Sequence, residues 1–180
     1  GVGVIENIDT FSDQNFKRKN DFILIIGKTT GHLTQSIYAN ELLNYKKGLP
    51  PKVNLEEELK NGLAIKELIN KRLIDTSHDI SDGGLLIALT EMSMKNIIGF
   101  ELKIEKDNLN SYLFGEDQAR YAIAVEENKI EDVRLLLNEK NVFFEEIGQA
   151  CKDRIIINNN NISILELKEI SENWFNNYLS

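Results

Sequence analysis

Phe22-Ile23-Leu24-Ile25-Ile26, closed by Gly27, is the stretch of this 180-residue sequence that indicates the fold most directly. Consecutive apolar residues before a glycine suit a strand that is buried on both faces, because neither face then has to meet water. We therefore expect this strand to lie in the middle of a sheet. The segment 121–125, in which large and small apolar residues alternate, predicts another strand.

Helical and strand patterns alternate along the rest of the chain. Asn54 with Glu57 three positions later predicts the start of a helix over 55–72. Further helices are expected at 36–45, 85–92, 130–137 and at the C-terminus, and further strands at 73–77, 100–104, 142–144, 155–157 and 162–165. This order predicts an α+β domain, or α/β, with a mixed sheet flanked by helices. We expect the aromatic side chains of the terminal helix to pack in the core of the domain, namely those of Trp174, Phe175 and Tyr178.

Composition limits the possible functions. With 42% hydrophobic and 28% charged residues and no apolar run of membrane length, the sequence predicts one soluble domain. The formal charge of -8 disfavours nucleic acid and anionic membranes as partners. An anionic ligand would therefore have to be bound by local groups, such as main-chain amides at the start of a helix.

Other sequence features narrow the chemistry and the location. Cys151 is the only cysteine, so an intrachain disulfide is impossible, and with only His32 and His78 besides it a Cys/His zinc site is excluded. The first residues contain neither Met nor a leader pattern. We expect a cytoplasmic piece of a longer product.

The segment His78-Asp-Ile-Ser-Asp-Gly-Gly84 is the densest group of reactive side chains, and it lies between a predicted strand and a predicted helix. Gly83 and Gly84 would let main-chain amides approach a phosphate, and Asp79 and Asp82 could hold a magnesium ion carried by a nucleotide. Alternatively, Ser81 or Asp82 only caps the helix and His78 is a buried structural imidazole. The spacing leaves both interpretations open.

Two more polar loops precede predicted elements. The segment 27–36 contains Gly31 and Ser36 but does not match a Walker phosphate loop, because its Gly-Lys-Thr triplet stands at the beginning of the loop. The segment Gly115-Glu-Asp-Gln-Ala-Arg120 gathers acidic, amide and guanidinium groups. Taken alone, the first predicts an ordinary capped turn and the second a polar surface turn.

Together the three loops resemble the phosphoribosylformylglycinamidine synthase family of small bacterial type. The resemblance also includes Gln35-Ser-Ile-Tyr38 and Pro50-Pro-Lys-Val53, and it extends along nearly the whole chain. It implies the fold of the C-terminal domain of the AIR synthetase superfamily over residues 21–180. Residues 1–20 would then be the end of a preceding N-terminal-type domain and a linker. Thr34 departs from the pattern, which has glycine there.

The family resemblance also implies an activity. Such enzymes use ATP and Mg²⁺ to activate formylglycinamide ribonucleotide, and ammonia from a glutaminase subunit then gives the amidine. This chain resembles the last of four domains, so the resemblance places the catalytic residues upstream and implies that the fragment is inactive alone. The implied partners are the upstream domains, the glutaminase subunit and a small accessory subunit. A non-catalytic scaffold for these subunits is the alternative.

The resemblance further implies an auxiliary nucleotide site for ATP or ADP. Its implied phosphate-binding residues are Gly31, Ser36, His78, Asp79, Ser81, Asp82, Gly83 and Gly84, with Asp79 and Asp82 as weak metal ligands. The segment 115–120 would be the counterpart of a substrate loop in the first half of the enzyme, through Gly115, Glu116, Asp117, Gln118 and Arg120. No catalytic residue is expected in this chain.

Overall fold

Strand β1 (Phe22–Ile26) lies inside a seven-stranded sheet, as its apolar sequence predicts. The computed structural model describes residues 3–5 and 7–179. β1 pairs antiparallel with β4 (Tyr121–Val125) on one side and with β5 (Phe144–Ala150) on the other. The sheet order is β2-β4-β1-β5-β3-β6-β7, and the remaining strands are β2 (Thr76–Asp79), β3 (Phe100–Leu102), β6 (Arg154–Ile157) and β7 (Asn160–Ser163). Because β3 and β6 are parallel, the predicted mixed sheet is confirmed.

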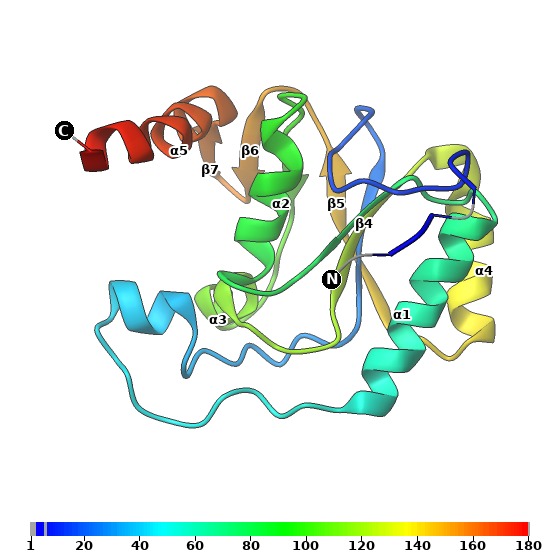
Figure 1. Cartoon of the computed structure of the whole chain (residues 1–180), viewed down its shortest axis with the longest axis horizontal. Helices are drawn as coiled ribbons and strands as arrows, with labels where there is room; N and C mark the ends of the chain where they lie inside the picture. Colours follow the sequence, from blue (N-terminus) through cyan, green and yellow to red (C-terminus); the bar gives the residue numbers. More distant parts are fainter. Residues whose placement is uncertain (1–2, 6, 180) are drawn as a thin grey trace.

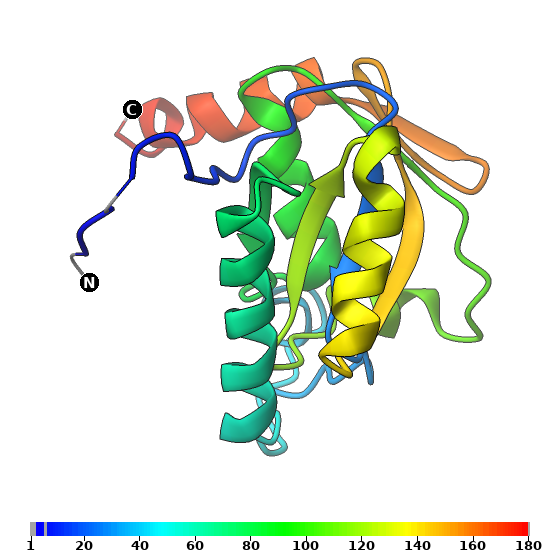
Figure 2. The same ribbon diagram turned by 90° about the vertical axis from the view of Figure 1, so that its right-hand side faces the viewer.

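Helices cover both faces of the sheet (Figure 1). The side chains of β1 alternate between the two faces. Ile23 and Ile25 pack in the cluster that contains α2 (Gly84–Met94), α3 (Leu109–Phe114) and the start of α5 (Ile164–Leu179). Leu24 and Ile26 pack on the opposite face, under α1 (Leu55–Asn70) and α4 (Ile130–Glu139). Figure 2 shows α1 and α4 running alongside each other over that face.

Several element boundaries differ from those predicted. The expected helix at 36–45 is only a π-helical turn, η1 (Tyr38–Leu42), and a 3-10 turn, η2 (Glu127–Lys129), precedes α4. The strand expected at 73–77 is β2, which begins later and carries His78 as a strand residue, because its pairing runs from Thr76 opposite Ala124 to Asp79 opposite Tyr121.

The N-terminal segment contacts the domain well before residue 21. The side chain of Phe16 is fully buried in the cluster with α2, and its amide donates to the carbonyl of Met92 at 2.9 Å. Asp13 forms an isolated bridge with Thr76. A boundary at residue 20 remains a prediction, but part of the segment 1–20 packs with the body of the domain.

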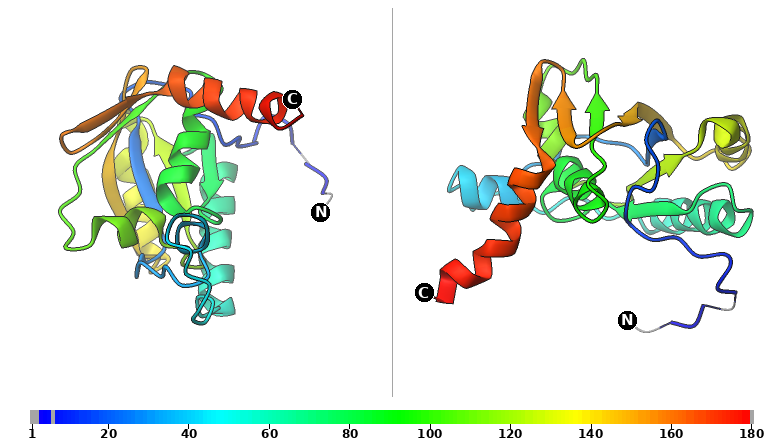
Figure 3. Two further views of the ribbon diagram at one scale, coloured as in Figure 1. Left: turned by 90° about the vertical axis from the view of Figure 1, so that its left-hand side faces the viewer. Right: turned by 90° about the horizontal axis from the view of Figure 1, so that it is seen from above.

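The end of α5 extends beyond the sheet (Figure 3). Trp174 is 63% exposed and Tyr178 is 75% exposed, and their rings stack on each other at 5.6 Å. The predicted core packing of these two residues is therefore wrong, and the side chain of Phe175 lies outside the described residues. Among the described residues, no helix combines the length and the apolar character needed to span a membrane.

Candidate functional site

Three loops that are far apart in the sequence meet at one end of the sheet, at the lower end of the molecule in Figure 1. The β1 loop (residues 27–36) follows β1. The segment 78–84, here called the β2 loop, runs from the end of β2 to the first residue of α2, and the β4 loop (residues 115–120) precedes β4. The Ile80 amide donates to the Arg120 carbonyl, and the Glu116 amide donates to the His32 carbonyl, each at 2.9 Å. The structure thus brings the sequence-predicted loops together.

The buried carboxylate of Asp117 binds main-chain amides of the β1 loop. Its carboxylate accepts hydrogen bonds from the amides of Thr30, Gly31 and His32 at 3.0, 2.9 and 3.3 Å, and also from the Thr30 hydroxyl. Burial disfavours the charged form of Asp117, but these bonds and the nearby Arg120 guanidinium outweigh burial and lower the pKa of Asp117. Asp117 is therefore an ionised, buried carboxylate.

Arg120 is the cation that accompanies this carboxylate, and its side chain is fully buried. Nε donates to the Asp117 carbonyl at 3.2 Å, one terminal nitrogen donates to the Thr29 hydroxyl at 3.1 Å, and the other donates to the Gly115 carbonyl at 2.5 Å. Burial lowers the pKa of Arg120, while the charge of Asp117 opposes that change. The pair joins the β4 loop to the β1 loop.

Glu116 makes the corresponding link to the β2 loop. Its Oε1 atom accepts from the Gly83 amide and from the Ile37 amide, each at 2.8 Å. Gly83 has φ +79° and immediately precedes α2, so the carboxylate lies at the positive end of that helix. The Gly84 amide donates to the Ser81 carbonyl at 3.0 Å. Both amides that the sequence suggested for an anion therefore have acceptors within the protein.

Glycine is required where the loops touch. At Gly115, a Cβ atom would lie 2.8 Å from the Cα of Gly31. At Gly84, where φ is +73°, a Cβ atom would lie 2.8 Å from the Gly115 carbonyl oxygen. Any side chain at these positions would push the loops apart.

The other predicted phosphate-binding residues differ in accessibility. Asp79, Ser81 and Asp82 are exposed at the rim of the β2 loop. The ring of His78 is mostly buried, with Nδ1 3.3 Å from the Asp79 carboxylate and Nε2 3.1 Å from the Glu91 carboxylate.

Ser36 and Thr34 lie in the β1 loop and have partners in or near it. Ser36 is fully buried, and its hydroxyl donates to the Leu33 carbonyl at 2.6 Å and accepts from the Ala39 amide at 3.1 Å. The hydroxyl of Thr34 donates to the Leu49 carbonyl at 2.7 Å. Gln118 is exposed.

Sequence reasoning missed two residues of α1 that hold the β4 loop. The Ala119 amide donates to Glu58 Oε1, and Asn61 Nδ2 donates to the Ala119 carbonyl, each at 2.8 Å. Ala119 needs this support because its φ is +59°, which is unusual for a residue other than glycine. The sequence could have indicated Asn61, because it is a polar residue at helical spacing from the apolar Ile65 and Leu68 and therefore lies on the buried face of α1.

The described residues contain no group of three or more histidine, cysteine, aspartate or glutamate side chains that could hold a metal ion. Asp79 and Asp82 alone would leave most positions of a magnesium shell unfilled. A magnesium site at these two carboxylates would need phosphate oxygens and water to complete its shell, and it remains a prediction.

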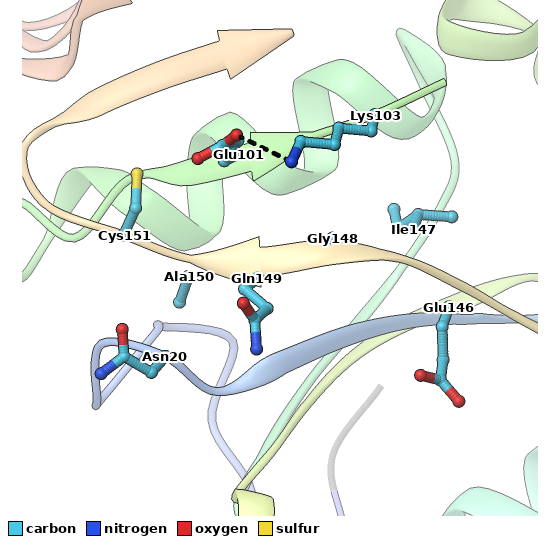
Figure 4. A pocket seen from close by; sticks show the side chains of 9 residues that line it. All are labelled: Asn20, Glu101, Lys103, Glu146, Ile147, Gly148, Gln149, Ala150 and Cys151. Atoms are coloured by element: carbon cyan, nitrogen blue, oxygen red, sulfur yellow. Dashed lines mark ion pairs between the residues drawn. The ribbon is translucent and has the colours of Figure 1, made fainter. Parts of the chain in front are cut away.

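A separate hollow of about 380 Å³ lies on the sheet face opposite α2, over β3 and β5 (Figure 4). Its charged side chains have local partners, since Glu101 pairs with Lys103 at 3.8 Å and Glu146 accepts from Arg134 Nε at 2.6 Å. None of the predicted site residues lines this hollow. The candidate site is therefore the cluster of the three loops.

Comparison with known proteins relates these loops to one family. The chain is 40% identical over 182 residues to the phosphoribosylformylglycinamidine synthase subunit PurL of Pelagibacter ubique, an alignment that covers 99% of this chain and 25% of the relative. The chain thus spans about a quarter of the length of that relative. A family model described as AIR synthase related protein, C-terminal domain, matches residues 18–158.

Solved structures support the same fold. PurL of T. maritima complexed with FGAR superposes with a TM-score of 0.71 at 18% identity, over 89% of this chain and 30% of that one. The same protein complexed with ATP gives 0.68 at 18% identity, over 89% and 28%. The fold matches and the family model covers most of the sequence, so this chain belongs to the AIR synthase related proteins as a C-terminal domain of that family.

Proposed function

We propose that the chain is the C-terminal domain of phosphoribosylformylglycinamidine synthase. This ligase of de novo purine biosynthesis makes formylglycinamidine ribonucleotide from formylglycinamide ribonucleotide, ATP and glutamine-derived ammonia. The similarity of 99% of the chain to a PurL subunit is the observation that carries the proposal. The chain spans a quarter of that relative. In this proposal the domain works in the cytoplasm together with upstream domains, which supply the catalytic residues, and it is inactive alone.

The site proposal concerns an auxiliary nucleotide site at the β2 loop. The exposed Ser81 and Asp82 and the helix start behind them would face the phosphates of ATP or ADP, and Asp79 with Asp82 would share a Mg²⁺ ion with those phosphates. His78 borders this rim, while Gly31 and Ser36 shape the adjoining β1 loop. The structure of T. maritima PurL complexed with ATP supports nucleotide binding by a relative.

The β4 loop has a supporting role in this proposal. Glu116 and Asp117 bind main-chain amides of the neighbouring loops, and Arg120 neutralises Asp117. Gly115 permits the close approach, and only Gln118 points an exposed side chain outward. In this proposal the loop holds the site together, and the catalytic groups come from the upstream domains.

The proposed partners are the upstream domains, a glutaminase subunit and a small accessory subunit. A structure of PurLQS from Thermotoga maritima supports an assembly of this kind for a relative. The proposal concerns the complete enzyme, of which this chain would be one part.

A chimaera tests the proposal. The segment of Pelagibacter ubique PurL that aligns with this chain is replaced by the chain, and the chimaera is expressed in a bacterium that lacks its own phosphoribosylformylglycinamidine synthase. We expect growth without added purine. The matched control is the same enzyme truncated before the replaced segment, which should not support growth. A chimaera that is produced in soluble form but gives no growth would contradict the proposal.

A non-catalytic scaffold is the second candidate, and one observation favours it. The amides of Gly83 and Gly84 already have acceptors within the protein. Calorimetric titration of the chain with ADP and Mg²⁺ separates the two candidates. Saturable heat that disappears in Asp82→Ala supports the auxiliary site, whereas no heat at millimolar nucleotide supports the scaffold.

A further inference from the structure

The outward side of α1 carries a row of exposed leucines. Leu55, Leu59 and Leu63 are 76%, 65% and 54% exposed, and their regular spacing aligns them along one side of the helix. The residues of α1 that face the core lie on the opposite side, namely Asn61, Ala64, Ile65 and Leu68. An ordinary surface helix is polar where it faces solvent, and α1 lies at the edge of the domain (Figure 2). This leucine row therefore has the character of a contact surface.

Two charged residues of α1 flank the leucine row. Glu56 lies in the first turn of the helix and Lys66 in its second half, at equal distances in sequence from Asn61. Both side chains are exposed. Among the residues that the structure describes, neither forms an ion pair, whereas Lys60 of the same helix pairs with Glu57 at 2.8 Å. The outward side of α1 thus has an acidic start, an apolar middle and a basic second half.

A second copy of α1 complements this arrangement when the two helices run antiparallel. With a two-fold axis beside Asn61, Glu56 of one copy lies opposite Lys66 of the other, and Leu59 lies opposite Leu63. The leucines then pack against each other between the two charged pairs. Such a contact is isologous, which means that the same surface serves both copies and closes the assembly as a dimer. The order of charges along α1 therefore matches a second copy of the same helix.

We propose that the leucine row is a dimer surface, on which a second copy of this chain packs its own α1 antiparallel, with Glu56 of each copy paired to Lys66 of the other. This dimer does not depend on the proposed function, because it requires neither nucleotide nor catalysis. The row is short, so the dimer should be weak and depend on protein concentration. α1 also holds the β4 loop through Glu58 and Asn61, so the dimer contact and the candidate site share one helix.

Sedimentation equilibrium of the 180-residue chain over a wide range of concentrations tests the dimer. The wild type should pass from monomer to dimer, without larger species, as its concentration rises. Leu59→Glu places a charge in the middle of the leucine row and should remain monomeric at every concentration. Leu135→Glu is the matched control, since Leu135 is 59% exposed on the neighbouring helix α4, and it should dimerise like the wild type.

Two outcomes of this experiment would overturn the proposal. A wild-type chain that stays monomeric throughout would leave the leucine row to another part of a longer protein. An equal loss of the dimer in Leu135→Glu would mean that any added charge prevents association, and that the contact is not made by α1.

The charged pairs are tested by exchanging them. Glu56→Lys and Lys66→Glu should each weaken the dimer by about fivefold or more, because both pairs of the two-fold contact become repulsive. The double variant Glu56→Lys/Lys66→Glu keeps the net charge and restores both pairs, so it should dimerise like the wild type. A mixture of the two single variants should also associate, since each contact between them joins opposite charges.

Net charge alone gives the opposite order. The chain has a formal charge of -8, and Glu56→Lys reduces the repulsion between copies, so a dimer formed without the charged pairs would tighten in this variant. Tighter association of Glu56→Lys, or a double variant that associates no better than the single variants, would overturn the antiparallel arrangement.

Discussion

At the scale of single residues, buried charge determines how the loops are held. Asp117 and Arg120 are both buried, and each satisfies main-chain or hydroxyl groups of the β1 and β4 loops as well as facing the other. Such a pair is costly to break from one side, because the remaining charge stays buried without compensation. The loops therefore depend on both members.

Replacing Asp117 with alanine should strongly destabilise the chain. The change leaves Arg120 without its carboxylate and three amides of the β1 loop without their acceptor. We expect the free energy of unfolding in urea to fall by about 3–5 kcal/mol. Asp107→Ala, at an exposed position, should change it by no more than about 0.5 kcal/mol. Equal effects of the two substitutions would contradict the role given to Asp117.

Asp21 should lower the free energy of unfolding as the pH rises, whereas most carboxylates in folded proteins raise it. Burial raises its pKa from 3.8 to about 6, with Glu126 and Asp75 adding to the rise and Arg18 opposing it. The unfolded chain then loses this proton at lower pH than the folded chain, so the contribution of Asp21 to stability is complete below pH 4 and is lost as pH rises through 6.

Urea unfolding of the wild type and of Asp21→Asn between pH 4 and 7 measures this effect. The asparagine variant should gain stability relative to the wild type as the pH rises, with the change concentrated below about pH 6. A difference between the two proteins that stays constant across this range would show that Asp21 titrates normally.

At the scale of elements, the local sequence correctly predicted the strands whose bounds depend only on their own apolar pattern. The strands at 22–26 and 121–125 have the predicted bounds. A short apolar run of this kind is stable in a domain of this size when it is buried as a strand inside the sheet. α3 was not predicted, since its six residues include Asn110 and Ser111, which have low helix propensity. Its start depends on Asn108, whose side chain accepts from the Ser111 amide at 3.1 Å.

The sequence predicted which polar residues belong to the candidate site but not which groups they bind. The sequence marked Glu116, Asp117 and Arg120 as a polar cluster, yet their partners lie far away along the chain, as with Thr30, whose amide bonds Asp117 over 87 positions. No local pattern reports such a contact. The same holds for β2, whose bounds follow from pairing with β4 and not from its own sequence.

At the scale of the whole molecule, the contribution of α5 to stability should be concentrated at its start. Ile164 is fully buried and Leu167 packs partly against the same cluster, whereas Ile170, Trp174 and Tyr178 are 64%, 63% and 75% exposed. The buried start joins the helix to the core under α2. Exposed residues of a helix contribute little to folding, because they remove little apolar surface from water.

Replacing the 64% exposed Ile170 with alanine should therefore leave the free energy of unfolding within about 0.5 kcal/mol of the wild type. Ile164→Ala is the matched comparison and should cost about 2–5 kcal/mol, since it deletes a fully buried side chain from the core. Both values come from urea unfolding followed by circular dichroism, with the slope of the transition checked for two-state behaviour. A loss in Ile170→Ala as large as that in Ile164→Ala would mean that the Ile170 side chain is packed against the domain in solution, contrary to its exposed position in this fold.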